Sequence, residues 1–227
     1  MAGVERLRGL IDELPAELRE RTLTHASWVS QRPASYGRLA FLGDSVLGLA
    51  IAEHLFRLWP DADIGRLTKV HGQAVSGRAC AAVAERLGIP VRLAELAPES
   101  AAGGIDAETL LASERALASL CEAAIGACYL EHGFAATAEA TVAAFEAEIE
   151  VATEQTLDYK SALQEALARD GARVTYEVTG EAGPAHERRF EVSATVGDEV
   201  VGSGSGLSKK AAEQEAAARA LERLRDG

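Results

Sequence analysis

The stretch RLAFLGDSVL, residues 38–47, decides the fold expected for this chain. It lies in a run over residues 36–58 that is rich in Leu, Ala, Ile and Phe and ends at Trp59–Pro60–Asp61. This run predicts one long helix that is apolar over more than one face, so we expect it to be central. On this apolar surface it carries a single aspartate, Asp44.

Working outward, apolar periodicity predicts an all-helical first domain over residues 1–152, with a loop at 97–107. Gly88 and Pro90 are expected to stop one helix, and His132–Gly133 to separate two others. The expected helices cover residues 4–14, 36–58, 64–87, 109–131 and 134–152.

The pattern changes after a short polar linker, residues 153–157. Asp158 can cap a helix through Arg169, and Gly197–Asp198 is a tight-turn signal. Alternation predicts strands at 173–179, 187–196 and 199–204, followed by an Ala-rich helix at 208–224. We therefore expect a small α-β-β-β-α domain over residues 158–227.

The stretch GSGSG, residues 202–206, reads as a glycine-rich turn that feeds the last helix, whose first residues include Lys209 and Lys210. Free backbone N–H groups, the helix dipole and two cations converge at such a helix start, which suits it to hold phosphate. Taken alone, the two lysines are also typical of a solvated helix start.

Charge, apolar runs and cysteine spacing limit the classes of protein to which this chain can belong. The net charge is −12, and residues 1–152 hold 13 Lys/Arg against 21 Asp/Glu, so binding to nucleic acid must use a local cationic patch. The N-terminus has no signal-peptide core, and no run of about 18 apolar residues predicts a membrane span. The cysteines, Cys80, Cys121 and Cys128, have no metal-ligand spacing, which favours buried thiols in a reducing cytoplasm.

Asp44 has a counterpart on a second expected helix, Glu122. Clustered carboxylates hold Mg²⁺ in phosphodiester cleavage, and residues three or four apart on a helix share a face. One turn before each carboxylate, however, stand Ala40 and Ser119. By themselves, Asp44 and Glu122 are more typical of ordinary solvated helix residues than of a metal site.

Four segments in order resemble the successive motifs of ribonuclease III, and the C-terminal part is similar to the double-stranded-RNA-binding domain that follows the nuclease domain in that family. The resemblance covers nearly the whole chain. The four segments are LTHASW (23–28), RLAFLGDSVL (38–47), GRLTK (65–69) and EAAIGACYL (122–130).

The resemblance implies a homodimeric, helical nuclease domain whose carboxylates bind Mg²⁺, with Mn²⁺ as a possible substitute. Asp44 and Glu122 match two acidic metal positions of the family. Phe41 and Leu42 match dimer contacts, although core packing explains Phe41 as well. The chain departs from the family at two metal positions and at two other usually acidic ones, namely Ala40, Ser119, Gly37 and Ile64. A two-metal site is therefore not expected, whereas a reduced one-metal site is possible.

In the second domain, three segments resemble the regions that read an A-form duplex by shape. Gln164 and Glu165 would reach one minor groove, and His186 in the loop 183–186 would reach the next, although a histidine there is also typical of an ordinary loop. Ser208, Lys209 and Lys210 would hold phosphates across the major groove between them.

These expectations favour a cytoplasmic, metal-dependent endoribonuclease that cleaves double-stranded RNA, of the kind that processes ribosomal-RNA precursors and messenger RNA. Two alternatives stay open because Ala40 and Ser119 stand at acidic positions of the family: a catalytically impaired RNA-binding dimer, and a ribonucleoprotein component.

Overall fold

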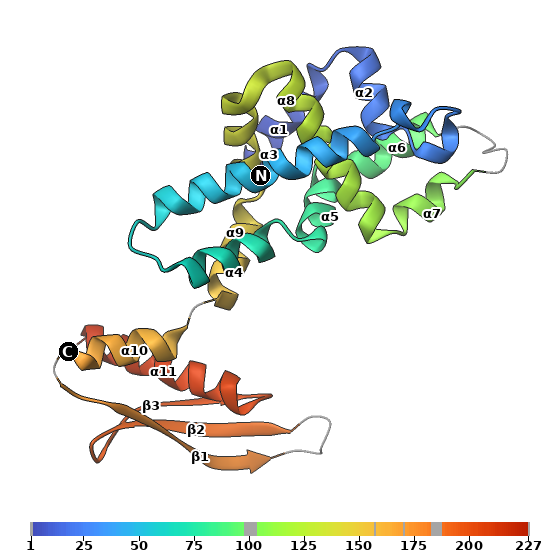
Figure 1. Cartoon of the computed structure of the whole chain (residues 1–227). Coiled ribbons are helices and arrows are strands. Elements are labelled where there is room, and N and C mark those ends of the chain that lie inside the picture. Colours follow the sequence, from blue (N-terminus) through green and yellow to red (C-terminus); the bar gives the residue numbers. More distant parts are fainter. Residues whose placement is uncertain (1, 98–103, 157, 170, 183–187, 227) are drawn as a thin grey trace. The chain divides into compact units, whose positions relative to one another are not determined.

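The computed structural model describes residues 2–97, 104–156, 158–169, 171–182 and 188–226 (Figure 1). The chain divides into two compact units, residues 1–156 and residues 157–227, which are described separately.

The described part of the first unit is helical, as expected. Its elements are α1 (Ala2–Asp12), α2 (Ala16–Leu23), the short 3-10 helices η1 (Ala26–Trp28) and η2 (Arg32–Ala34), α3 (Gly37–Leu58), α4 (Ile64–Ala74), α5 (Gly77–Arg86), α6 (Ile89–Leu96), α7 (Ala107–Leu111), α8 (Glu114–Ala144) and α9 (Glu146–Thr156).

The helix expected over residues 64–87 is two helices, α4 and α5. Asp63 starts the first by accepting hydrogen bonds from the backbone N–H groups of Gly65 and Arg66. Ser76 starts the second by accepting one from the N–H of Ala79, at 3.3 Å. The apolar periodicity runs through this junction, but the serine cap divides the segment.

Gly133, with φ 77° and ψ 176°, has a non-helical backbone inside α8 and so separates two helical segments, as expected. Another expected boundary was wrong. The expected linker begins inside α9, because residues 153–156 are still helical. There the hydroxyls of Thr153 and Thr156 donate hydrogen bonds of 2.6 Å to the carbonyl oxygens of Ile149 and Ala152, within the helix.

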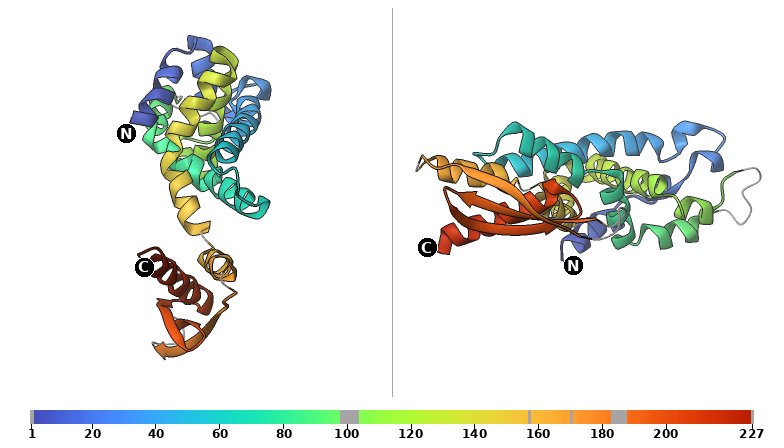
Figure 2. Two further views of the ribbon diagram at one scale, coloured as in Figure 1. Left: turned by 90° about the vertical axis from the view of Figure 1, so that its left-hand side faces the viewer. Right: turned by 90° about the horizontal axis from the view of Figure 1, so that it is seen from below.

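The core of the first unit lies where α3 packs along α8 (Figures 1 and 2). Leu47 and Ile51 of α3 and Ile125 of α8 are fully buried. All three cysteines are buried free thiols, as expected. By length and composition α3 could cross a membrane, with a mean hydropathy of 1.5, but a core helix passes the same test and 44% of that window is buried.

The second unit has the expected α-β-β-β-α order. Its antiparallel sheet, in the order β1-β2-β3, is packed against α10 and α11 (Figure 2). Gly197, with φ 61°, forms the expected turn between β2 and β3. The elements are α10 (Tyr159–Ala168), β1 (Val174–Ala182), β2 (Arg189–Val196), β3 (Glu199–Gly206) and α11 (Lys209–Asp226).

The glycine-rich stretch before α11 is part of strand β3 and not the expected turn. A Cβ atom on Gly204 would lie 2.4 Å from the backbone nitrogen of Ala216. A Cβ atom on Gly202 would lie 2.3 Å from the carbonyl oxygen of the same alanine, Ala216. The glycines are therefore needed because helix α11 approaches the strand too closely for side chains.

Candidate metal centre and nucleic-acid interface

Two glycines set the distance between α3 and α8. A Cβ atom on Gly43 would lie 1.7 Å from the carbonyl oxygen of Glu122, and one on Gly126 would lie 2.2 Å from that of Leu39. No side chain fits at either position, so the helix backbones touch directly. Asp44 follows Gly43, and this contact therefore brings the two sequence-predicted carboxylates together.

The carboxyl group of Glu122 is influenced by the charge of Asp44. Asp44 is exposed and Glu122 is half-buried. The pKa of Glu122 is raised to about 7, first by burial and second by the negative charge of Asp44. Asp44 thus presents oxygen donors to solvent near Glu122, and a cation there would relieve the repulsion.

The neighbouring positions supply no further carboxylate. Ala40 is buried in the core, and Ser119 is half-buried one turn before Glu122. Gly37 and Ile64 are exposed. Among the described residues, no group of three or more His, Cys, Asp or Glu side chains is placed to hold a metal ion. Two carboxylates with open solvent access still fit Mg²⁺, which commonly keeps several waters and takes one or two carboxylates from a protein.

Phe41 does not pack in the core of the chain, because 80% of its surface is exposed. Leu49 and Phe56 on the same helix are 57% and 71% exposed, and Ala52 between them is also exposed. These four residues, which we call the α3 stripe, lie on one side of the helix by their spacing. Leu42 is half-buried beside this stripe.

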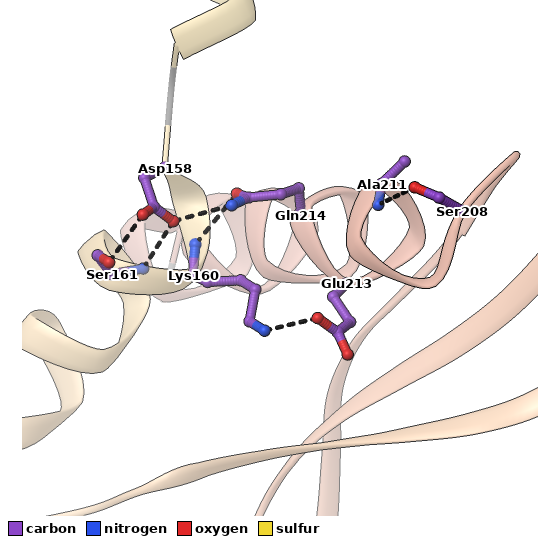
Figure 3. A network of polar contacts seen from close by, with 7 residues as sticks. All are labelled: Asp158, Lys160, Ser161, Ser208, Ala211, Glu213 and Gln214. Carbon is purple, nitrogen blue, oxygen red and sulfur yellow. Dashed lines mark hydrogen bonds and ion pairs between the residues drawn. The ribbon is translucent and has the colours of Figure 1, made fainter. Parts of the chain in front are cut away.

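The phosphate-binding side chains expected on the second unit lie at the start of α11. The hydroxyl of Ser208 accepts a hydrogen bond of 3.1 Å from the N–H of Ala211 and so caps the helix (Figure 3). Lys209 and Lys210 are both exposed. The Nζ atom of Lys209 lies 3.9 Å from Oε1 of Glu181 and 5.7 Å from the ring centroid of Phe190.

The other expected RNA contacts are Gln164, Glu165 and His186. Gln164 and Glu165 are exposed on α10. His186, with the rest of loop 183–186, lies outside the described residues.

A polar network that the sequence did not predict joins α10 to α11 (Figure 3). Gln214 donates a hydrogen bond of 2.8 Å to Asp158, the N-cap of α10. Lys160 lies 2.6 Å from Glu213 and covers the ring of Tyr176 at 4.7 Å. Burial, followed by the charges of Glu213 and Asp158, raises the pKa of Tyr176 to about 12.

Residues 15–147 match the family described as "Ribonuclease-III-like", and residues 159–224 match the "Double-stranded RNA binding motif". The chain belongs to the ribonuclease III family. It is 38% identical to Ribonuclease 3 of Streptomyces coelicolor over 219 residues, which is 94% of this chain and 76% of that protein. Identity to Ribonuclease 3 of Thermobifida fusca is also 38% over 219 residues, covering 94% of this chain and 88% of the relative.

A solved ribonuclease III nuclease domain from Campylobacter jejuni is 27% identical, with a TM-score of 0.52, and the match covers 64% of this chain and 97% of that one. That structure concerns flexibility in a region involved in dimer formation. Membership of the ribonuclease III family confirms the expected fold and the expected class, a double-stranded-RNA endoribonuclease that binds RNA through its C-terminal domain.

Proposed function

We propose that this ribonuclease III cleaves duplex RNA at a reduced metal site formed by Asp44 and Glu122 alone. The observation that supports the proposal is the close backbone contact between Gly43 and Glu122, beside which the charge of Asp44 contributes to the raised pKa of Glu122. The family resemblance assigns acidic residues to the positions of Ala40 and Ser119, so this site has lost two negative charges.

A bound Mg²⁺ would activate a water molecule and neutralise charge on the departing oxygen. Asp44 and Glu122 would hold the ion, with the remaining positions left to water and substrate phosphate. Glu122, whose pKa is about 7, can also hold or release a proton at its carboxyl group near neutral pH. Ser119 can offer only a neutral hydroxyl, and Ala40 offers no ligand.

The α3 stripe supports a homodimer built on residues 36–58. An exposed run with two phenylalanines on a central helix is costly in water, and a second copy related by a two-fold axis would bury it. We further propose that the dimer works in the cytoplasm and that Ser208, Lys209, Lys210, Gln164, Glu165 and His186 contact the duplex.

Cleavage of one long RNA duplex tests the reduced site, with Mg²⁺ and with Mn²⁺ in parallel. We expect the wild type to cut slowly and to need high metal, Asp44→Asn and Glu122→Gln to be inactive, and Ala40→Glu with Ser119→Asp to raise the rate by orders of magnitude. Asp61→Asn, an exposed change outside the site, is the matched control.

Calorimetric titration with Mg²⁺ gives a second readout, in which Asp44→Asn should abolish binding and the double variant should strengthen it. Because Ala40 is buried, the thermal stability of the double variant must be measured alongside. If the wild type and Asp44→Asn are equally inert while the double variant cuts, the protein is an RNA-binding dimer that has lost its chemistry.

A further inference from the structure

A groove of about 900 Å³ lies in the nuclease domain, at the end of α3 remote from Asp44. Its apolar lining comes from Leu58 and Trp59 at the end of α3, from half-buried Val142 of α8 and from Ile149 of α9, which is 6% exposed and belongs to the core beneath. The guanidinium group of Arg66 lies over the Trp59 ring, 4.5 Å from its centroid. This volume is within the range of sites that bury a ligand or an anchoring side chain.

The apolar lining is a continuation of the core. Leu47, Ile51, His54 and Leu58 follow one another at helical spacing along one side of α3. Leu47 and Ile51 are fully buried, whereas Leu58 is 51% exposed. The core-facing side of α3 therefore runs on into the groove without a covering element, on the side of the helix away from the α3 stripe.

The rim of the groove has an excess of carboxylates, because Arg6, which also lines it, is already paired with Glu139. Glu146, Glu150 and Glu154 line it from α9, four residues apart, which places successive carboxylates roughly 6 Å apart along the helix. All three are exposed and make no ion pair with another described residue. By contrast, Glu148 on another side of α9 pairs with Arg86 at 2.6 Å. Like charges at this spacing oppose one another until a cation lies between them.

We propose that this groove is a docking site for a basic amphipathic helix of a partner protein. Apolar side chains of that helix would lie on Leu58, Trp59 and Val142, and its Lys or Arg residues would pair with the three rim carboxylates. The negative rim excludes RNA, and the apolar walls distinguish the site from one that binds any small cation. Docking at this groove does not depend on whether the metal site is active.

Trp59 provides a built-in reporter, because the chain has two tryptophans and Trp28 does not line the groove. In a Trp28→Phe background, a synthetic helical peptide with Leu on one face and Lys on the other, free of aromatic residues, should change the fluorescence of Trp59 saturably at 1:1 stoichiometry. Glu150→Lys with Glu154→Lys should weaken binding at least tenfold and flatten its salt dependence. Glu95→Lys with Glu131→Lys makes the same charge change at exposed positions outside the groove and should leave binding unchanged.

Equal weakening by both pairs of substitutions would overturn the proposal, since it would show general attraction to an acidic protein. Binding of spermine or of a Lys-only peptide as tightly as the amphipathic peptide would also overturn it, because the apolar walls would then contribute nothing. Trp28 donates a hydrogen bond to the carbonyl oxygen of Ile105, so its replacement can disturb folding. Calorimetry with the unaltered full chain and the same peptides then decides the same question.

Discussion

The backbone of Gly43 lies so close to Glu122 that a Cβ atom on the glycine would be 1.7 Å from the glutamate carbonyl oxygen. One contact therefore has two effects, because it lets α3 and α8 pack at the centre of the domain and places Asp44 beside Glu122. The residues that let the two helices pack closely are therefore also those that bring the two carboxylates near each other.

Gly43→Ala should separate the two helices. The added methyl group meets backbone atoms, which cannot rotate away, so we expect a loss of about 1–3 kcal/mol in the free energy of unfolding. For a chain of this size that corresponds to a fall of roughly 2–4 °C in Tm per kcal/mol. Gly72→Ala is the control: Gly72 lies in α4 with open space around it, so alanine there should leave Tm unchanged or raise it. A Gly43→Ala protein as stable as wild type would contradict the close crossing.

Glu122 should make stability depend on pH in an unusual direction for a carboxyl group. Its pKa is raised in the folded state, so between about pH 4.5 and 7 the folded protein binds more protons than the unfolded chain. Its stabilising contribution is complete below that window and is lost as the pH rises through about 7. We expect Glu122→Gln to remove this part of the pH dependence in chemical denaturation.

Asp44→Asn gives the companion measurement for the same group. Because burial is the larger cause of the shift, removing the Asp44 charge should lower the pKa of Glu122 only in part. A carboxyl-selective NMR titration would show it, and a full return of the pKa to the ordinary value would mean that the Asp44 charge, and not burial, causes the shift.

Disruption of the α3 stripe should yield monomers. Phe41→Asp with Phe56→Asp places two charges where the second copy would pack, so light scattering at micromolar concentration should report half the wild-type mass. Val91→Asp, at a position on α6 that is 64% exposed, introduces the same kind of change outside α3 and should stay dimeric. A wild-type monomer would refute the proposed interface.

The two lysines of α11 should differ in their effects on RNA binding. Lys209 is partly engaged with Glu181 and Phe190, whereas Lys210 has no ion pair with any described residue. We therefore expect Lys210→Ala to weaken duplex binding more than Lys209→Ala. Removal of a lysine that contacts a phosphate should also reduce, by about one, the slope of the logarithm of the binding constant against the logarithm of the salt concentration. Arg219→Ala, on the same helix but paired with Glu215, should have little effect in the same filter-binding assay.

Much of the fold could be predicted from short stretches of the sequence. The length of α3, the Asp158 cap and the alternating strands were all evident in the sequence, because each depends on neighbouring residues. The break at Ser76 was missed since the apolar spacing continues through it. The interruption at Gly133 was predicted correctly, because glycine readily adopts the positive φ that breaks the helix there.

The candidate site was predicted less completely. Asp44 and Glu122 were identified through the family resemblance, but their shared environment depends on Gly43 and Gly126 meeting across two helices, which no spacing reveals. The same applies to Lys160 and Glu213, which lie far apart in the chain and pair only once α10 packs on α11.

The contact between β3 and α11 has a consequence for how the RNA-binding domain can diverge. Gly202 and Gly204 face Ala216 and Ala220, whose side chains are single methyl groups. Almost any inherited replacement there must add bulk against main-chain atoms, and no neighbour can shrink to compensate. The amino-acid sequence at this contact between β3 and α11 should therefore change far more slowly in evolution than that of the outer face of the same sheet. On the outer face, a larger side chain simply extends into water.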